Sequence, residues 1–296
     1  MRQVAHRVAG NRSVLLGLIG AGIAGSRTPA MHEAAASALG LPLVYRRIDV
    51  DRGPSLPLAE LMKLAEWVGF DGLNITYPYK QEVLPLLDAL SDDARGVGAV
   101  NTVVLRDGRR VGHNTDTWGF ADAFRTELAG VPRRRVLQLG AGGAGAAVAY
   151  ALLREDAGEL RLFDPRRDRA ETLASELARV FDARRISVAS DAESGAEGCD
   201  GIVNASPVGM DKLPGTPLPA DAIPADAWVA DIVYFPIETE LLATARARGH
   251  RVMNGGGMAL KQAVRAFELF TGHAADEEVM RRAFDDAPRL LAADGG

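Results

Sequence analysis

The sequence contains two copies of the pattern G-x-G-x-x-G, and each copy follows a short apolar run. The first copy occupies residues 20–25 and the second occupies residues 140–145. In doubly wound α/β proteins this pattern joins a buried strand to a helix whose N-terminus binds the pyrophosphate of a dinucleotide. A chain of 296 residues forms one large domain or two ordinary ones. We therefore expect one loop to bind a dinucleotide and the other to serve a different purpose.

The second copy has the surroundings that a dinucleotide loop requires. Residues 135–139 (RVLQL) are strand-like, and a helix is expected to begin inside the glycines, where small residues allow close packing on the sheet. The next strand-like run, residues 159–163, is followed directly by Asp164, about 20 residues after the loop, where an acid binds the ribose hydroxyls. We predict that the dinucleotide contacts Gly140, Gly142, Gly143, Ala144, Gly145 and Asp164.

The charges after this strand bear on the choice between NAD and NADP. The carboxylate of Asp164 can accept hydrogen bonds from both adenosine ribose hydroxyls, and it repels a 2′-phosphate. Arg166, Arg167 and Arg169 follow closely and would favour a phosphate. We predict NAD because Asp164 ends the strand directly, and NADP is the less favoured alternative.

The first copy departs from the dinucleotide geometry. Thr28 and Pro29 follow its last glycine, and a proline in the first helical turn places the helix start at residue 28 or 29, beyond the loop. The segment instead presents two hydroxyls, those of Ser26 and Thr28, beside a helix N-terminus, which suits a small anion such as a carboxylate. Two interpretations are open: the hydroxyls hold a substrate anion, or Thr28 only caps its own helix.

Alternating strand-like and helical patterns predict an α/β fold. From residue 135 onward the alternation is regular, which indicates a parallel, doubly wound sheet. The first part is also α/β, with a short helix expected over residues 80–87 and a hairpin turn at Asp107-Gly108. Residues 258–291 are mostly helical by pattern.

The composition excludes several classes of protein. The net charge of −5 and the pI near 5.6 provide no basic surface for nucleic acid. No apolar run is long enough for a membrane helix, although Arg2, Arg7 and Arg12 before the apolar residues 14–19 imitate a signal peptide. We interpret residues 14–19 as a buried strand. The single cysteine, Cys199, excludes an internal disulfide framework and a cluster of thiolate metal ligands, and it fits a cytoplasmic protein.

Polar clusters between the two parts contain candidate catalytic groups. Lys80 follows Pro78 at the expected start of a helix, where the helix dipole disfavours a positive charge, as suits a general base near neutral pH. Asp116, in the segment GHNTDTWGF, would orient this lysine and balance its charge. On these residues alone, a solvated lysine and a helix-capping aspartate form an open alternative.

The order of the motifs resembles that of the shikimate dehydrogenase family, and most of all its NAD-dependent quinate/shikimate dehydrogenase branch. The resemblance covers nearly the whole chain and rests on SRTPAMH, NITYPYKQ, GAVNT, GHNTD, GAGGAG, NASPVGM, DIVYFPIETELL and GGGMALKQA, in family order. It implies a substrate-binding and catalytic α/β domain at residues 1–115 and an NAD-binding Rossmann domain at residues 116–257. The C-terminal helices, residues 258–296, are expected to return to the substrate domain.

The resemblance also implies a role for each motif. Lys80 would be the acid and base in the oxidation of quinate or shikimate to 3-dehydroquinate or 3-dehydroshikimate, with Asp116 as its partner. The first glycine loop would then serve the substrate, because the resemblance places the carboxylate at Ser26 and Thr28, with Tyr234 reaching toward it. The ring hydroxyls would be bound by Thr76, Asn101 and Gln262. Further cofactor contacts are expected from Arg169, Ala205, Pro207, Val208, Val233, Gly255 and Met258.

Two departures from the commoner biosynthetic members favour the NAD-linked branch. Those members have a second serine where this chain has Thr28, and Asn-Arg-Thr/Ser for NADP where it has Asp164-Pro165-Arg166. An NADP-dependent biosynthetic shikimate dehydrogenase, a dehydrogenase of aminated analogues and a non-catalytic dinucleotide-sensing protein are the alternatives. The expected partner is a polyhydroxylated cyclohexane or cyclohexene carboxylate, and a homo-oligomer is left open.

Overall fold

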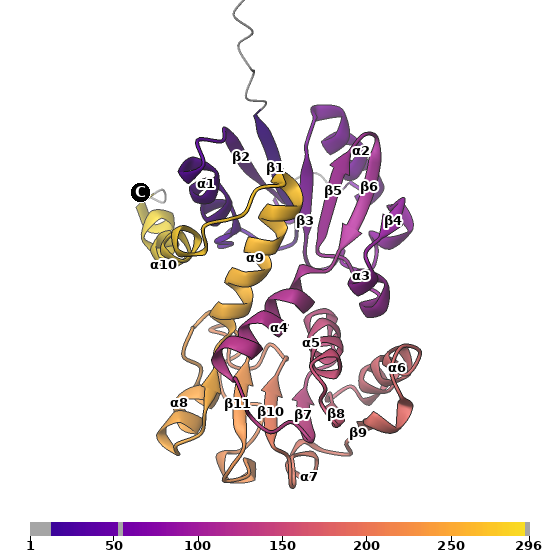
Figure 1. Cartoon of the computed structure of the whole chain (residues 1–296), viewed down its shortest axis with the longest axis vertical. Helices are drawn as coiled ribbons and strands as arrows, with labels where there is room; N and C mark the ends of the chain where they lie inside the picture. The colour runs from indigo at the N-terminus through magenta and orange to yellow at the C-terminus, as the bar shows by residue number, and fades with distance from the viewer. Residues whose placement is uncertain (1–12, 53–55, 294–296) are drawn as a thin grey trace, which may run out of the picture.

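The computed structural model describes residues 13–52 and 56–293, with side chains described as far as Ala287. Two six-stranded sheets lie at opposite ends of the molecule, and helices run between them (Figure 1). The apolar run near the N-terminus forms the first strand, Val14–Gly20, as predicted. The arginines on which the signal-peptide interpretation rests, Arg2, Arg7 and Arg12, lie outside the described residues.

The first sheet is mixed, with the strand order β2-β1-β3-β5-β6-β4. Its central strand β1 pairs in parallel with β2 and β3, whereas β5 pairs antiparallel with β3 and β6. The β5–β6 hairpin turns at Asp107 and Gly108, both with positive φ, as the sequence predicts. The strands are β1 (Val14–Gly20), β2 (Leu43–Asp49), β3 (Gly72–Ile75), β4 (Ala89–Leu90), β5 (Thr102–Arg106) and β6 (Arg109–His113), and the helices between them are α1 (Thr28–Ala38), α2 (Leu58–Val68) and α3 (Asp92–Val97).

The second sheet is entirely parallel, with the order β12-β11-β10-β7-β8-β9. This order reverses beside β7, as in doubly wound dinucleotide-binding folds, and it confirms the predicted Rossmann architecture. The strands are β7 (Arg135–Leu139), β8 (Glu159–Phe163), β9 (Ile186–Val188), β10 (Gly201–Asn204), β11 (Trp228–Asp231) and β12 (Val252–Met253), and the helices are α5 (Gly143–Arg154), α6 (Arg167–Leu177), α7 (Ala192–Ala196) and α8 (Glu240–Ala247).

Helices α4 (Thr115–Glu127) and α9 (Gly255–Thr271) pack along each other between the two sheets (Figure 1). Gly119 permits this contact, because a Cβ there would lie 2.7 Å from the backbone nitrogen of Gln262. The last helix, α10 (Glu277–Ala293), packs on α1, and Met31, Phe267 and Phe284 share one buried cluster. The domain bounds predicted above stay a prediction.

The helix predicted over residues 80–87 is wrong. The segment consists of turns and a single turn of 3-10 helix, η1 (Leu84–Leu86). Pro85 has no N–H for an α-helical hydrogen bond and disfavours the α conformation at Leu84, so a full helix cannot form there. The sequence interpretation also missed β4, α3, α7 and α8, which are all short. Two further 3-10 turns are η2 (Ala183–Arg185) and η3 (Ala220–Ala222).

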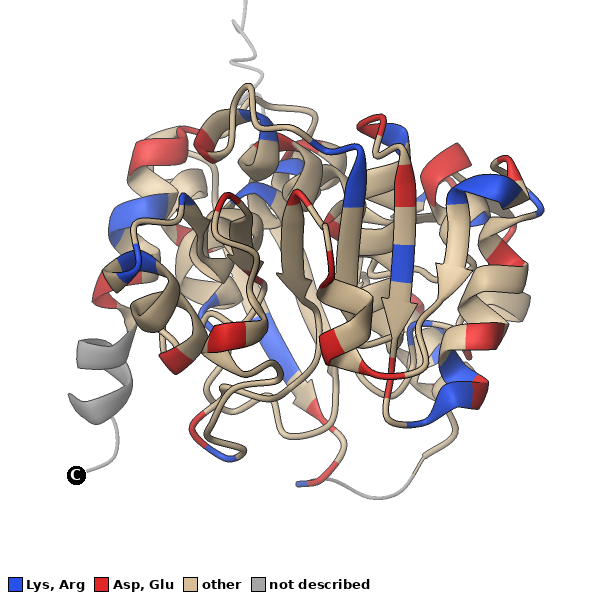
Figure 2. Ribbon diagram, turned by 90° about the horizontal axis from the view of Figure 1, so that it is seen from below, with Lys and Arg blue, Asp and Glu red and all other residues tan. Residues whose placement is uncertain are grey.

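Charged residues of both signs are interspersed on the side of the molecule seen in Figure 2. Among residues 13–52 and 56–293, no helix is both long enough and apolar enough to cross a lipid bilayer.

Candidate functional site

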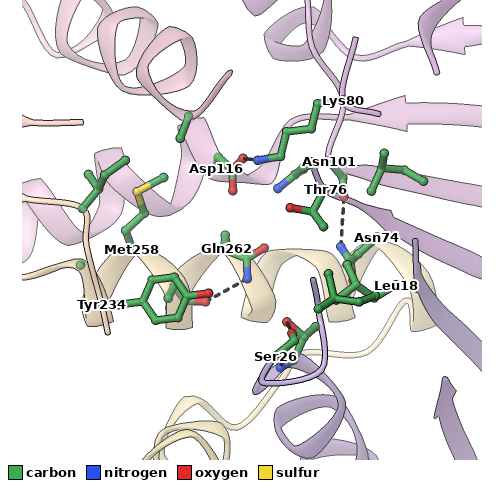
Figure 3. A pocket seen from close by; sticks show the side chains of 17 residues that line it. Leu18, Ser26, Asn74, Thr76, Lys80, Asn101, Asp116, Tyr234, Met258 and Gln262 are labelled. Carbon is green, nitrogen blue, oxygen red and sulfur yellow. Dashed lines mark hydrogen bonds and ion pairs between the residues drawn. The ribbon is translucent and has the colours of Figure 1, made fainter. Parts of the chain in front are cut away.

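A cavity of about 210 Å³ is lined by residues from the ends of both sheets and from α4 and α9 (Figure 3). Each of its polar side chains comes from one of the motifs on which the sequence interpretation rests. The predicted catalytic and substrate-binding residues that line it are Ser26, Thr28, Thr76, Lys80, Asn101, Asp116, Tyr234 and Gln262. The structure therefore brings these residues together, and their individual roles stay predictions.

An ion pair joins the two predicted catalytic residues across this cavity. Nζ of Lys80 lies 2.6 Å from Oδ2 of Asp116, and the two side chains are 19 % and 12 % exposed. Lys80 is held by its backbone, since its carbonyl accepts a hydrogen bond from the N–H of Val100 at 2.8 Å. Asp116 lies in the first turn of α4, where the positive end of the helix dipole favours its negative charge. The pair places a proton carrier beside a fixed carboxylate.

The hydroxyls of Ser26 and Thr28 meet at the N-terminus of α1. Oγ of Ser26 donates to Oγ1 of Thr28 at 3.1 Å, and the backbone N–H of Thr28 donates to Oγ of Ser26 at 3.3 Å. Thr28 is the first helical residue, and the cap position belongs to Arg27, which makes no side-chain capping bond. The capping interpretation of Thr28 is therefore wrong, because its hydroxyl lies beyond the cap position and faces Ser26 instead.

The carboxamides of the cavity are held in place by neighbouring groups. Oδ1 of Asn101 accepts a hydrogen bond from the N–H of Thr115 at 2.7 Å, and its Nδ2 donates to the Thr115 hydroxyl at 3.0 Å. Nε2 of Gln262 donates to the carbonyl of Ala259 at 3.0 Å. Since these side chains are already oriented, they lose little further conformational entropy when a ligand binds them.

Asn74 also lines the cavity, and the sequence interpretation missed it. Its Oδ1 accepts a hydrogen bond from the Tyr45 hydroxyl at 2.7 Å, and its Nδ2 donates to Oγ1 of Thr102 at 3.0 Å. A signal for Asn74 was present in the sequence. It lies two residues before Thr76 in one extended segment, so the two side chains are expected on the same face.

Tyr234 is a cavity residue whose hydroxyl has a raised pKa. The residue as a whole is 43 % exposed, yet it lines the cavity. Burial of the hydroxyl raises the pKa of Tyr234, and the positive charges of Lys80 and Arg27 partly oppose this. The phenol therefore stays protonated near neutral pH and is available as a hydrogen-bond donor.

The second glycine loop borders a neighbouring cavity of about 680 Å³. Thr76, Lys80 and Ala144 line both cavities, so the two are adjacent. Of the predicted cofactor residues, Gly142, Gly143, Ala144 and Arg169 line the larger cavity, whereas Ala144, Gly255 and Met258 line the smaller one.

The loop geometry fits the pyrophosphate of a dinucleotide. Gly140 has φ +102°, and a Cβ there would lie 2.7 Å from the carbonyl oxygen of Ala205. At Gly142 and Gly143 a Cβ would have no neighbour within 4 Å, which leaves space beside the exposed N-terminus of α5. Nε2 of Gln138 donates to the carbonyls of Gly140 and Gly145, each at 2.9 Å, and so holds the loop in shape.

Asp164 connects this loop to the turn that follows β8. Its Oδ2 accepts a hydrogen bond from the N–H of Ala141 at 2.9 Å, and its Oδ1 accepts one from the N–H of Arg166 at 2.9 Å. Arg166 pairs with Asp168 at 2.9 Å, and Arg167 pairs with Glu171 at 2.7 Å. Two of the three arginines that would favour a phosphate are thus already paired with acids.

Seven of the predicted cofactor residues line neither of the two cavities: Gly140, Gly145, Asp164, Ala205, Pro207, Val208 and Val233. The last four lie on loops that a buried carboxylate ties together. Oδ1 of Asp231 accepts hydrogen bonds at 2.9 Å from Nδ2 of Asn204 and from the N–H of Val233. Burial raises the pKa of Asp231 to about 6, against the lowering effect of these bonds. Contacts from Ala205, Pro207, Val208 and Val233 to a cofactor stay predictions.

No group of three or more His, Cys, Asp and Glu side chains in the described part of the chain could hold a metal ion.

Comparisons with known proteins agree with this geometry. Residues 18–103 match the domain described as "Shikimate dehydrogenase substrate binding domain", and residues 255–283 match the "Shikimate 5'-dehydrogenase C-terminal domain". A shikimate dehydrogenase (NADP(+)) of Streptomyces avermitilis is 51 % identical over 89 % of this chain and 92 % of its own length. A quinate/shikimate dehydrogenase (NAD(+)) of Corynebacterium efficiens is 48 % identical over 92 % of this chain and 98 % of its own.

A solved structure shows the same architecture. Quinate dehydrogenase from Corynebacterium glutamicum, in complex with NAD, superimposes with a TM-score of 0.90 at 46 % identity. The match covers 93 % of this chain and 99 % of that one. The chain therefore belongs to the shikimate dehydrogenase family.

Proposed function

We propose that the chain is an NAD-dependent dehydrogenase that oxidises quinate, shikimate or both to 3-dehydroquinate and 3-dehydroshikimate. One observation carries the proposal: the Lys80–Asp116 ion pair, 2.6 Å long, lies where the substrate-sized cavity meets the cavity of the glycine loop. The relatives named quinate/shikimate dehydrogenase and quinate dehydrogenase support this substrate class.

Oxidation of a secondary alcohol removes a hydride from carbon and a proton from oxygen. A bound nicotinamide supplies the hydride acceptor. Lys80 accepts the hydroxyl proton as the carbonyl forms, and Asp116 holds the resulting ammonium in position.

The other polar side chains of the cavity hold the substrate in this proposal. Ser26 and Thr28 bind the carboxylate at the N-terminus of α1, where the helix dipole favours an anion. Tyr234 adds a hydrogen-bond donor from the loop after β11. The ring hydroxyls are bound by Thr76, Asn101 and Gln262.

The preference for NAD is proposed from the charges around the ribose site. Asp164 offers a carboxylate to the ribose hydroxyls, while the pairing of Arg166 with Asp168 and of Arg167 with Glu171 weakens their attraction for a phosphate. An NADP-dependent shikimate dehydrogenase is the second candidate, because Arg169 lines the larger cavity and the Streptomyces relative is named for NADP. A cytoplasmic location forms part of the proposal, since Cys199 has no second cysteine to pair with.

Initial rates with quinate and shikimate, each against NAD and NADP, test the proposal. We expect kcat/KM to be higher with NAD than with NADP for at least one of the two substrates. A preference for NADP would support the second candidate. Absence of turnover and of binding with both substrates would leave an aminated analogue or a dinucleotide sensor as the explanation.

A further inference from the structure

Arg27 lies between the two hydroxyl residues of the substrate loop, but its side chain has a different environment. Ser26 and Thr28 line the cavity, whereas Arg27 is absent from the described residues that line it. The Arg27 guanidinium carbon lies 4.5 Å from the ring centroid of Phe284 and 5.4 Å from that of Phe235. Its Nη1 also donates a hydrogen bond to the carbonyl of Phe284 at 3.2 Å. The arginine is therefore engaged at three points outside the cavity.

The partners of Arg27 come from two different parts of the molecule. Phe284 belongs to α10 and is buried with the core residues of α1. Phe235 belongs to the loop after β11 of the parallel sheet, and the preceding residue, Tyr234, lines the cavity. The rings of Tyr234 and Phe284 also touch, with centroids 6.2 Å apart and an interplanar angle of 49°. We call these four residues, Arg27, Tyr234, Phe235 and Phe284, the clasp.

We propose that the clasp ties the loop that binds the substrate carboxylate to the rim formed by the parallel sheet, and that Arg27 is a positioning residue for substrate binding. This inference rests on the proposed function, in which Ser26 and Thr28 hold the carboxylate. Arg27 acts through these neighbours, because it is not itself part of the cavity lining.

The substrate loop is also held by contacts within itself and with β2. The N–H of Ser26 donates to the carbonyl of Ile23 at 3.0 Å, and the carbonyl of Ala24 accepts a hydrogen bond from Arg47. Arg27 adds the contacts to α10 and to the loop after β11. A glycine-containing loop loses more conformational entropy on ordering than other loops do. Contacts that hold it before the substrate arrives reduce this cost, so that more of the binding energy is expressed as affinity.

The contact is favourable both for the exposed aromatic rings and for the Arg27 guanidinium. Tyr234 and Phe235 are 43 % and 50 % exposed, and of the two Tyr234 lines the cavity. A guanidinium over an aromatic face is attracted by the ring quadrupole and stacks well, because it is planar and weakly hydrated. A competing explanation is that the Arg27 charge attracts the substrate carboxylate from a distance, and the experiment must separate the two.

The test compares Arg27→Leu, Phe235→Leu and the double variant with the wild type. Arg282→Leu is the matched control, since it removes an exposed positive charge from α10, where Arg282 pairs only with Glu278 among the described residues. We expect each single clasp variant to raise the KM for the substrate by roughly three- to tenfold, as for a partly desolvated cation–π contact. The kcat and the dissociation constant of NAD are expected to stay within about twofold, since no variant touches the ion pair or the glycine loop.

The pattern among the variants separates the clasp from simple attraction. In the clasp, Arg27→Leu and Phe235→Leu disrupt the same contact, so the double variant raises KM less than the product of the single effects. If the Arg27 charge acts alone, only Arg27→Leu raises KM, and a salt concentration of about 0.5 M abolishes the difference from wild type. That outcome, or multiplicative effects in the double variant, would overturn the proposal.

Hydrogen–deuterium exchange of the peptide that covers residues 20–30 provides a readout without substrate. Both single clasp variants are expected to speed its exchange in the NAD-bound protein, whereas Arg282→Leu leaves it unchanged. Unchanged exchange in both clasp variants would contradict the clasp even if the wild type turns over quinate. If the clasp variants exchange faster but the wild type neither binds nor oxidises quinate and shikimate, the clasp is retained and the proposed function is rejected.

Discussion

Replacement of Asp164 by alanine is expected to reverse the cofactor preference. Losing one hydrogen bond from a ribose hydroxyl to a charged acceptor costs roughly 1.5–3 kcal/mol, which raises the KM for NAD by about ten- to a hundredfold. The KM for NADP is expected to fall instead. At an effective dielectric constant of about 20, two like unit charges about 4 Å apart repel by about 4 kcal/mol, and Asp164→Ala removes this repulsion from the 2′-phosphate.

The same carboxylate also holds the glycine loop, so the assay must distinguish recognition from loop damage. Asp164 accepts hydrogen bonds from the N–H groups of Ala141 and Arg166, each at 2.9 Å. Loss of these bonds alone would raise the KM for both cofactors together. Opposite changes in the two KM values, measured by initial rates at saturating substrate, are the expected result.

A nearby acid provides the control for Asp164→Ala. Asp168 lines the larger cavity, which Asp164 does not, and it pairs with Arg166, but its side chain is 70 % exposed. Asp168→Ala is expected to leave the KM for NAD nearly unchanged and to lower the KM for NADP modestly, because Arg166 is released. A wild type that already prefers NADP, or an Asp164→Ala variant with an unchanged NAD-to-NADP ratio, would refute the reasoning.

Two further substitutions test the substrate loop and the core beneath it. Thr28→Val is expected to raise the KM for quinate and shikimate by about ten- to a hundredfold, since a hydrogen bond to a charged group is worth roughly 1.5–3 kcal/mol. Thr28→Ser is the active control. An unchanged KM for Thr28→Val in initial-rate assays would show that the hydroxyl does not bind the substrate. Complete burial lowers the pKa of His32 from 6.5 to about 3, and neither ring nitrogen has a hydrogen-bond partner among the described residues. The folded state thus keeps His32 neutral, and the stability this contributes is lost as pH falls from about 6.5 toward 3. This loss of unfolding free energy can reach roughly 4–5 kcal/mol, and His32→Leu is expected to reduce it. Identical acid-unfolding curves by circular dichroism for the wild type and His32→Leu would contradict this prediction.

Local sequence patterns were sufficient to predict most of the fold. The second glycine loop, the regular alternation after residue 135 and the Asp107-Gly108 turn all lead to the observed elements, because each depends on short-range backbone preferences. The pattern of residues 80–87 predicts a helix because Lys80 follows Pro78, as at a helix start, but Pro85 removes an N–H that the helix needs and leaves only a 3-10 turn. The helix α8 has Leu241, Leu242 and Ala245 on one buried face, but its eight residues, Glu240–Ala247, are too few for that spacing to stand out in the sequence.

The two glycine loops look alike in sequence for different physical reasons. In the second loop, open space at Gly142 and Gly143 leaves room for a ligand. In the first loop, a Cβ at Gly20 would lie 2.2 Å from Cγ2 of Thr76, so this glycine brings the Thr76 segment close. Both loops also receive a strand-end aspartate, since the N–H of Gly22 donates to Asp49 at 3.2 Å much as that of Ala141 donates to Asp164.

The candidate site was only partly predictable from sequence. Lys80 and Asp116 belong to separate motifs, so the sequence alone does not exclude that Lys80 is merely a solvated lysine. Packing of α4 against α9 brings Asp116 to the cavity that Lys80 lines. The contacts of Arg27 with Phe235 and Phe284 could not be predicted, because they join distant parts of the chain, 257 positions apart for Phe284, through side-chain geometry. Such long-range contacts leave no periodic signal in the sequence.

Turnover by Lys80→Ala tests the central claim most directly, namely that Lys80 is the acid and base of a hydride-transfer reaction. The protein is expected to fold normally and to bind NAD as the wild type does, because the glycine loop is untouched. The kcat is expected to fall at least about a hundredfold, as for loss of a general base. Near-normal turnover of Lys80→Ala with quinate or shikimate across the pH range would contradict the account.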